Sequence, residues 1–259
     1  PATRGFPMLD LRGQGAVIVG TKRVGAVVAR RIADEGANIA IVYRSSKVEA
    51  QTLQRDLAER TEKVTLIQAD LSKEADVERA IGTAVDDLGG LRFAVNLAAG
   101  FPRTPFADLD SAAWERSMGD ARGSYLLGVH AGRSMMNNDG PTRGHIVFFA
   151  DWAALHAPYR DYLPYMTAKA AIDFMTRAFA AELAPSGILV NAIAPGPTMR
   201  PPDIDPDSWE RDVVAHAPLA RESAASEIAE MVTTLLKSET ITGETIRVDA
   251  GRHLAGPGK

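Results

Sequence analysis

The sequence predicts a doubly wound α/β domain in which about seven parallel strands are covered by helices on both faces. Short apolar runs alternate with amphipathic stretches along nearly the whole chain of 259 residues, a pattern typical of repeated β–α units. Most of these runs are apolar throughout, as expected for strands buried on both faces. No internal repeat or long linker divides the sequence, so we expect a single domain over residues 1–259.

The expected elements follow one another in regular order. Gly36 and the pair Gly89-Gly90 mark two helix ends, and Ser72 is a candidate N-cap. The expected strands cover residues 16–19, 37–43, 64–68, 93–97, 145–149, 189–193 and 245–248. The expected helices cover residues 24–35, 47–60, 73–88, 111–137, 162–184 and 224–237.

The composition excludes several classes of function. The chain carries 29 basic and 33 acidic residues, a net charge of −4, and lacks the basic excess with which nucleic-acid binders neutralise phosphates. It has no cysteine and five scattered histidines, which argues against a disulfide scaffold, a thiol nucleophile or a metal site. No apolar run approaches the ~20 residues that span a bilayer, and no secretory signal is recognisable. We therefore expect a soluble, cytoplasmic protein that acts on a small molecule.

A glycine-containing turn, residues 20–25 (GTKRVG), joins the first predicted strand to an Ala- and Val-rich helix. Such a turn presents backbone N–H groups and the positive end of the helix dipole to a phosphate. The candidate phosphate-binding residues are Gly20, Thr21, Lys22, Arg23 and Val24.

The end of the second predicted strand indicates which nucleotide this turn binds. It reads Tyr43, Arg44, Ser45, at the place where NAD-binding folds of this kind usually carry an acid for the ribose 2′-hydroxyl. An arginine there accommodates a 2′-phosphate instead. With Lys22, Arg23 and Arg44 converging on one corner, the sequence predicts an NADP(H) site. The alternative is that all three are solvated surface cations.

A phenol and an ammonium lie on one face of the predicted helix 162–184. Tyr165 and Lys169 are four residues apart and are therefore neighbours on the helix surface. A phenol with a pKa of ~10 is a poor acid–base group at neutral pH, and a nearby ammonium lowers that pKa by stabilising the phenolate. The two residues form a candidate catalytic pair. The alternative is an amphipathic helix with a packed tyrosine and a solvated lysine.

A proline-rich segment, residues 195–206 (PGPTMRPPDIDP), follows the sixth predicted strand. Its prolines exclude a regular helix or a central strand. Ligands of open α/β sheets bind beyond the carboxyl ends of the strands, so we expect a substrate loop around residues 195–218 that acts as a lid. A plain surface loop is the alternative.

Several ordered motifs occur at regular intervals: the turn at residues 20–25, Asp70-Leu71, residues 96–99 (NLAA), 165–169 (YMTAK), 191–196 (NAIAPG) and 242–251 (TGETIRVDAG). Together they resemble those of the classical short-chain dehydrogenase/reductase family. The resemblance implies a Rossmann domain, a nicotinamide-dependent oxidoreductase and a homo-oligomer, either a tetramer or a dimer. It also implies that Tyr165 protonates the substrate, and that Lys169 binds the nicotinamide ribose and lowers the pKa of the tyrosine. The further residues that it places around the cofactor are Asp70, Leu71, Asn96, Ala98, Pro195, Gly196 and Thr198.

Three positions depart from the family pattern. Val19 takes the place of the first turn glycine, and its side chain would narrow the space for a pyrophosphate. The fifth strand ends without the family's serine, and Asp151 is the proton-handling residue there. The family's asparagine corresponds to either Asp120 or Ala121, depending on the end from which the helix is counted.

The combination of Asp151, Tyr165 and Lys169 resembles the pteridine reductase branch of the family, in which an aspartate replaces the serine. A carboxylic acid that works with a phenol suits proton delivery to a ring nitrogen. Flanking Phe149 and Trp152 would desolvate Asp151 and raise its pKa, which helps to keep it protonated.

Three further features fit that branch and one does not. The turn carries its Lys-Arg-x-Gly pattern at residues 22–25, and Phe101 occupies the place of a phenylalanine that stacks on the pterin. Tyr162 also fits, so Phe101 and Tyr162 are the candidate substrate contacts. Ala99 replaces a serine that contacts the pteridine, and an ordinary pocket aromatic is the alternative reading of Phe101.

The sequence therefore supports three functional hypotheses. The first is an NADPH-dependent reductase of a planar heterocycle such as a dihydropterin, or of a carbonyl. The second is a reductase of 3-oxoacyl thioesters or other ketones. The third, from another class, is an NADP(H)-binding regulator with little catalysis.

Overall fold

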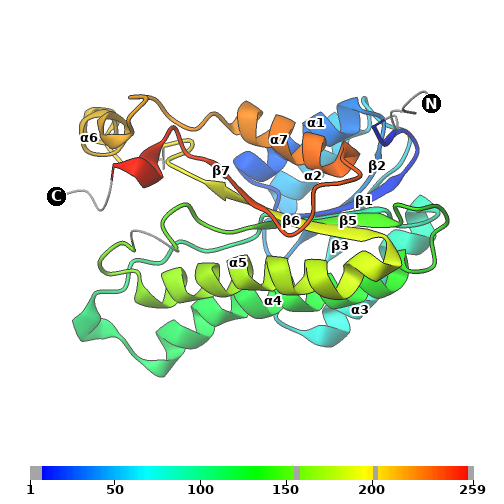
Figure 1. Cartoon of the computed structure of the whole chain (residues 1–259), viewed down its shortest axis with the longest axis horizontal. Coiled ribbons are helices and arrows are strands. Elements are labelled where there is room, and N and C mark those ends of the chain that lie inside the picture. Colours follow the sequence, from blue (N-terminus) through cyan, green and yellow to red (C-terminus); the bar gives the residue numbers. More distant parts are fainter. Residues whose placement is uncertain (1–7, 155–157, 201–203, 256–259) are drawn as a thin grey trace, which may run out of the picture.

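Seven parallel strands form one sheet in the order β3-β2-β1-β4-β5-β6-β7 (Figure 1). The computed structural model describes residues 8–154, 158–200 and 204–255. This architecture confirms the fold class that the sequence predicts. The strands are β1 (Gly15–Val19), β2 (Asn38–Tyr43), β3 (Val64–Gln68), β4 (Phe93–Asn96), β5 (Gly144–Phe149), β6 (Ile188–Pro195) and β7 (Thr245–Val248).

Helices cover both faces of the sheet (Figure 1). One face carries α1 (Val24–Asp34), α2 (Lys47–Leu57) and α7 (Ala225–Lys237). The other carries α3 (Glu74–Leu88), α4 (Ser111–Met135) and α5 (Leu163–Leu183). A short helix, α6 (Pro206–Asp212), lies at the end of the molecule that also holds the C-terminal segment. No helix within the described ranges is long and apolar enough to cross a membrane.

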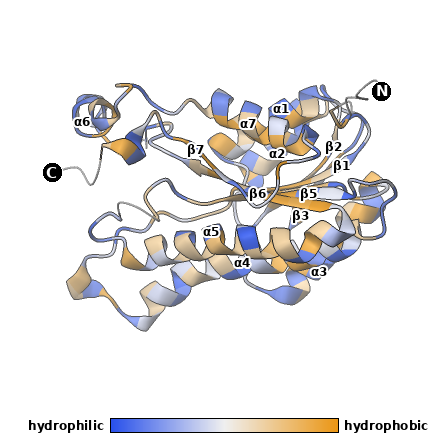
Figure 2. Cartoon of the chain, in the orientation of Figure 1, coloured by the Kyte–Doolittle hydropathy of each residue, from blue (hydrophilic) through white to orange (hydrophobic). Residues whose placement is uncertain are grey.

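Alternate residues of the central strands supply the two halves of the core. In β1, Val17 and Val19 pack with the helices α3, α4 and α5, whereas Ala16 and Ile18 pack with α1 and α7. Figure 2 shows the same division, with apolar residues along the strands and on the helix sides that face them, and hydrophilic residues outside. Because both sheet faces are covered, strands such as β2 are buried at every position.

The observed elements differ from the expected ones mainly at their ends. Lys73, in extended conformation, is the N-cap of α3; the expectation for Ser72 is wrong because its hydroxyl and N–H both donate to Asp70. The proline-rich region also contains an unexpected helix, α6. Pro206 suits its first turn because a first-turn N–H has no helical partner, and the Asp205 carboxylate accepts from Ser208 N at 2.9 Å.

The strand order reverses between β1 and β4, which are adjacent in the sheet. The connection from β1 leads to one side of this point and the connection from β4 to the other. Ligands of doubly wound sheets bind in the crevice that opens at such a point, beyond the carboxyl ends of the strands. The fold therefore predicts a ligand-binding site at the residues that follow β1, β4 and the neighbouring strands.

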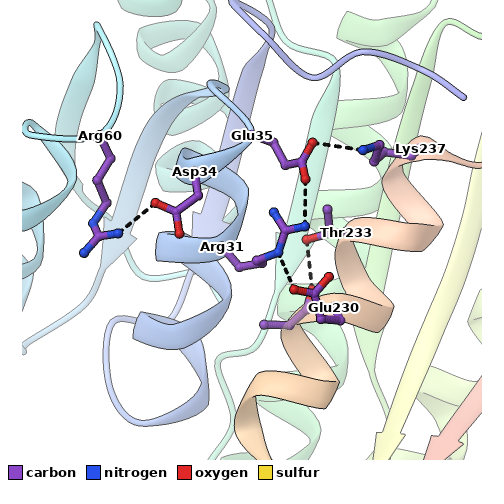
Figure 3. Close-up of polar contacts among 8 residues, drawn as sticks. Arg31, Asp34, Glu35, Arg60, Glu230, Thr233 and Lys237 are labelled. Carbon is purple, nitrogen blue, oxygen red and sulfur yellow. Dashed lines mark hydrogen bonds and ion pairs between the residues drawn. The ribbon is translucent and has the colours of Figure 1, made fainter.

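Charged residues join α1 to α7 on the surface of one helical layer (Figure 3). Glu35, which follows α1, accepts from Lys237 Nζ at 2.9 Å and pairs with Arg31 at 2.7 Å. Arg31 also reaches Glu230 of α7 at 2.5 Å. Hydrogen bonds from Lys237, and then from Arg31, lower the pKa of Glu35. The carboxylate of Glu35 therefore links both helices.

We predict that Glu35→Gln lowers the free energy of unfolding by about 1 kcal/mol at pH 7, as expected for a partly exposed ion-pair network. Because the pKa of Glu35 is lowered in the folded protein, the stabilisation exists above the unfolded pKa of ~4.3 and is lost as the pH falls through the folded value. Urea denaturation at pH 7 and at low pH measures the difference. The exposed Glu59→Gln serves as the control, and an equal loss in both variants at pH 7 would refute this role of Glu35.

Candidate active site

A hydrogen-bonded carboxyl–phenol pair lies beyond the carboxyl end of β5. Asp151 follows this strand by two residues, and Tyr165 lies in the first turn of α5. The Tyr165 hydroxyl donates to Oδ2 of Asp151 at 2.8 Å. Although thirteen residues separate them in the sequence, the two side chains meet at the carboxyl ends of the strands, and the structure thus brings Asp151 and Tyr165 together.

The other carboxylate oxygen of Asp151 is also occupied. Its Oδ1 accepts from the backbone N–H of Ala153 at 2.8 Å and from the Tyr159 hydroxyl at 3.1 Å. Asp151 therefore has a fixed orientation, with one oxygen turned toward Tyr165 and the other held by its own loop.

Burial controls the protonation of this pair. It raises the pKa of Asp151, and hydrogen bonds from Ala153 and Tyr165 oppose that rise without cancelling it. Burial, followed by the charge and hydrogen bond of Asp151, raises the pKa of Tyr165 well above its usual value. The expected lowering of the Tyr165 pKa is not what this arrangement gives, because burial is the largest effect and Asp151 adds to it. Both groups favour their protonated forms.

Lys169 lies one turn further along α5 and is buried. Its Nζ donates to the carbonyl of Phe149 at 2.7 Å and lies 5.8 Å from the centre of the Tyr165 ring. Burial lowers the pKa of Lys169, while the charges of Asp151 and Asp120 act against that change. The ammonium is thus held beneath the phenol at the end of β5.

The structure distinguishes Asp120 from Ala121. Ala121 is buried in the core between the sheet and α4, whereas Asp120 faces the site. Asp120 Oδ2 accepts from the backbone N–H of Gly100 at 2.9 Å, and its charge acts on Lys169. Burial raises the pKa of Asp120. Asp120 therefore connects α4 to the loop after β4 and to the lysine of α5.

Aromatic side chains form one wall of the site, which we call the aromatic wall: Phe101, Tyr159, Tyr162 and Tyr165. Phe101 stacks on Tyr162 with ring centres 4.5 Å apart and an interplanar angle of 24°. It meets the edges of Tyr165 at 4.9 Å and Tyr159 at 6.2 Å. Phe101 is 58% exposed, so one side of its ring remains available beside the Tyr165 hydroxyl.

Polar contacts tie the two loops of the aromatic wall together. Arg103 pairs with Asp161 at 2.6 Å, and the N–H of Thr104 donates to the carbonyl of Asp161 at 2.6 Å. Asp161 has a positive φ of 68°, a conformation that Asp tolerates better than most residues. These contacts hold Phe101 against Tyr162, although the two residues are far apart in the sequence.

The turn after β1 is compressed against the loop after β4. Gly20 has a φ of 104°, and a Cβ on it would lie 3.2 Å from the backbone nitrogen of Ala98. A Cβ on Gly25 would lie 2.3 Å from the carbonyl oxygen of Gly20. Both positions require glycine for close backbone approach, and α1 begins inside this turn at Val24. The expectation for Val19 is wrong, because its side chain is buried in the core among residues that α3, α4 and α5 cover.

Two of the three cations predicted to converge bind different segments of the chain. Lys22 pairs with Glu49 of α2 at 2.6 Å. Arg23, at a strained φ of 52°, donates to the carbonyls of Thr198 and Met199 beyond β6. Arg44 is exposed at the end of β2. The predicted single corner is therefore wrong in part, since Arg23 binds the segment after β6 and thereby joins it to the turn.

Five more predicted residues lie near the carboxyl ends of β1, β2 and β3. Thr21 Oγ1 and Ser46 Oγ lie 2.9 Å apart, which joins the glycine turn to the start of α2. Asp70 accepts from Ser72, and this bond, with the charge of Arg44, lowers its pKa. The remaining residues here are Tyr43, the last of β2, the exposed Ser45 beside Arg44, and Leu71, which packs against the core.

Backbone positions after β4 and β6 complete the edge. Asn96 donates to Ser124 Oγ at 3.0 Å and accepts from the N–H of Ala98 at 3.1 Å, so its side chain shapes the loop that faces Gly20. β6 ends at Pro195, and a Cβ on the next residue, Gly196, would lie 2.6 Å from the Cα of Asp249. Thr198 Oγ1 donates to the carbonyl of Gly196 at 3.0 Å. Part of the predicted substrate loop, residues 201–203, lies outside the described residues.

Sequence reasoning missed Tyr159. It lies in an irregular segment after β5, where no helix or strand period relates it to Asp151. The spacing of Tyr159, Tyr162 and Tyr165, three residues apart each time, was an available signal. Within the described residues no group of three or more metal-binding side chains is gathered.

A doubly wound sheet with a tyrosine–lysine pair and a glycine turn at its carboxyl edge defines a Rossmann-type oxidoreductase. A family model described as enoyl-(acyl carrier protein) reductase matches residues 19–253. The chain belongs to the short-chain dehydrogenase/reductase family.

Known relatives resemble the chain over nearly its full length. The 3beta-hydroxysteroid dehydrogenase 1 of Eggerthella lenta is 30% identical over 260 residues, covering 95% of each chain. The structure of FolM alternative dihydrofolate reductase 1 from Brucella suis, in complex with NADP, has a TM-score of 0.83 and 29% identity, covering 93% of this chain and 95% of that one. A blue fluorescent protein from a metagenomic library, in complex with NADPH, has a TM-score of 0.85 and 31% identity, covering 94% and 99%.

We predict that Asp151→Asn stabilises the protein at alkaline pH. The pKa of Asp151 is raised in the folded state, so ionisation penalises folding as the pH rises above the unfolded value of ~3.9. Asparagine keeps the shape of the neutral acid without that penalty. The thermal midpoint of the variant should exceed that of the native protein at pH 8 by about 2 °C or more, and by less at pH 5.

Differential scanning fluorimetry across this pH range measures the effect. The exposed Asp86→Asn is the matched control and should show no gain that grows with pH. A constant or decreasing difference for Asp151→Asn would contradict a raised pKa at this position.

Proposed function

We propose that the protein is an NADPH-dependent reductase that transfers hydride to a planar heterocycle of the dihydropterin type. The observation that carries this proposal is the carboxyl–phenol pair of Asp151 and Tyr165 beside the exposed ring of Phe101. A flat ring bound against Phe101 would present an edge to the Tyr165 hydroxyl. Two acids that share a hydrogen bond at that edge suit the protonation of a ring nitrogen.

The residues at the sheet edge fit a dinucleotide. A side chain at position 20 or 25 would collide with neighbouring backbone. Because both residues are glycine, the turn can stay compact and present its backbone N–H groups and the start of α1 to a pyrophosphate. Arg44 is exposed at the end of β2, where it suits a ribose 2′-phosphate. The proposed cofactor site is completed by residues that follow the other strands: Thr21, Lys22, Ser45, Asp70, Asn96, Ala98, Pro195, Gly196 and Thr198. The NADP and NADPH complexes of the structural relatives support this assignment.

The reduced nicotinamide supplies the hydride when the cofactor is bound. The chain's own residues manage the proton and the orientation of the substrate. Tyr165 donates its phenolic proton to the substrate atom beside the one that is reduced, and Lys169 would hold the nicotinamide ribose. Phe101, supported on its other side by Tyr162, holds the substrate ring by stacking. Asp120 holds the loop that carries Phe101 through the N–H of Gly100.

A ketone or 3-oxoacyl thioester is the second candidate substrate. One relative is a 3beta-hydroxysteroid dehydrogenase, which supports a ketone, and the matching family model is described as enoyl-(acyl carrier protein) reductase, which supports an acyl thioester. The dihydrofolate reductase relative supports the pterin. Ala99 cannot donate a hydrogen bond to a substrate ring through its side chain. The Asp151–Tyr165 pair favours the heterocycle, because a serine is what the family's carbonyl reductases usually place there.

We further infer a homo-oligomer, a dimer or tetramer. The outer faces of α4 and α5 expose apolar rings, including Tyr125 at 50% and Phe174 at 65%. Burial of such rings against a second copy is favourable.

Steady-state oxidation of NADPH is predicted to be faster with dihydrobiopterin or dihydrofolate than with an acetoacetyl thioester. Tyr165→Phe should lower kcat about 100-fold or more, since it removes the proton donor. Phe101→Ala should mainly raise KM for the pterin, because stacking contributes to substrate binding and not to proton transfer in the transition state.

Each other outcome identifies a rival. Turnover of the thioester without any turnover of pterins would replace the heterocycle with a ketone. Tight NADPH binding without turnover on a broad panel, unaffected by Tyr165→Phe, would indicate a regulator.

The choice of cofactor is tested with Arg44→Asp. We predict that it weakens NADPH binding at least 10-fold more than NADH binding, because the exchanged charge repels only the 2′-phosphate. Fluorescence titration with both nucleotides measures the ratio. Arg55→Asp on the exposed side of α2 is the charge-matched control, and equal weakening of NADPH and NADH by Arg44→Asp would refute the assignment.

A further inference from the structure

The two oxygens of the Asp151 carboxyl have unequal surroundings. Among the described residues, Oδ2 has one hydrogen-bond partner, the Tyr165 hydroxyl at 2.8 Å. Oδ1 accepts two hydrogen bonds, one from the N–H of Ala153 at 2.8 Å and one from the hydroxyl of Tyr159 at 3.1 Å. A carboxylate oxygen has two lone pairs in its plane, so both acceptor positions of Oδ1 are filled.

Tyr159 is a donor in this arrangement. Its hydroxyl donates to Oδ1 of Asp151 at 3.1 Å. The ring of Trp152 packs edge-on against the ring of Tyr159, with 5.6 Å between their centres, and holds the hydroxyl in this direction. Burial, with the charge of Asp151, raises the pKa of Tyr159, which keeps that proton in place over the working pH range.

Occupation of Oδ1 decides where a neutral Asp151 carries its proton. The acid has one proton, and Oδ1 faces two donors, so the proton belongs on Oδ2. Tyr165 donates across the 2.8 Å contact when Asp151 is ionised; in the neutral acid the same contact is donated by Oδ2 to the oxygen of Tyr165. The phenolic proton of Tyr165 is then released from Asp151 and can turn toward the exposed ring of Phe101, where the substrate binds.

We propose that Tyr159 is a positioning residue that directs the acid proton of Asp151 to Oδ2, so that Asp151 reprotonates Tyr165 during reduction. This inference rests on the proposed function, in which a reduced nicotinamide dinucleotide is the reductant. As the substrate nitrogen gains its proton, the O–H bond of Tyr165 breaks. The Oδ2–H bond of Asp151 then breaks as the phenol re-forms. Asp151 is left as a carboxylate and regains a proton from water before the next turnover.

Other charged and titratable groups face the same pair. Lys169 and Tyr165 approach from α5, and Asp120 of α4 acts on both of them. Arg252 lies over the Trp152 ring, 5.1 Å from its centre, on the C-terminal side. A Tyr159→Phe change leaves all these groups in place and removes one hydroxyl, so its effect on Asp151 can be separated from theirs.

The test is an infrared titration of Tyr159→Phe. The band of a neutral carboxylic acid is assigned to Asp151 by its loss in Asp151→Asn, and its midpoint is followed with pH. Removal of a donor that stabilises the ionised carboxylate should raise the midpoint by about one pH unit. In turnover with a dihydropterin, the alkaline fall of kcat should shift upward in parallel, and kcat on the acidic plateau should drop about 10-fold.

Tyr125→Phe on the outer face of α4 is the matched control and should leave both midpoints unchanged. An unshifted carboxyl midpoint in folded Tyr159→Phe, with only a lower melting temperature, overturns the proposal. If that variant does not fold, Trp152→Phe should give a smaller upward shift, because the smaller ring packs less closely against Tyr159 and directs its hydroxyl less firmly at Asp151, and no shift again overturns the proposal. A shifted midpoint without turnover of any pterin supports the role of Tyr159 and refutes the proposed substrate.

Discussion

The hydrogen bond between Tyr165 and Asp151 is the interaction on which the organisation of the site depends. A carboxyl in partly buried surroundings is costly when ionised and unpaired, and the loop after β5 supplies partners for both of its oxygens. These partners bring Tyr159 and Tyr165 to one point. Phe101 and Tyr162 then pack around them, so the aromatic wall follows from the need to satisfy one carboxyl group.

The same bond changes the acid–base logic of the tyrosine. Where a nearby ammonium is the dominant charge, the pKa of a phenol falls. Here the pKa of Tyr165 rises, because burial and a carboxyl at 2.8 Å outweigh a lysine that is held by the Phe149 carbonyl. A phenol that stays protonated is a proton donor rather than a base, which agrees with a reductase direction.

The segment after β6 connects the site to the glycine turn. Arg23 binds the carbonyls of Thr198 and Met199, and this contact costs a strained backbone at Arg23 itself. Doubly wound folds place a dinucleotide between these two segments. Arg23 therefore links the two segments between which folds of this kind bind a dinucleotide.

The sequence alone determined the sheet, its buried strands and the positions at their carboxyl ends, because apolar periodicity and parallel β–α order are local patterns that need no distant contact. It also placed Tyr165 and Lys169 on one face, since helical spacing is local. The partners of Arg23, the choice of Asp120 over Ala121 and the role of Tyr159 were decided by the tertiary structure. Each depends on the path of an irregular loop or on contacts between segments distant in the chain. The periodicity of the sequence does not report such contacts, because they form only when the ends of separate strands come together at one edge of the sheet.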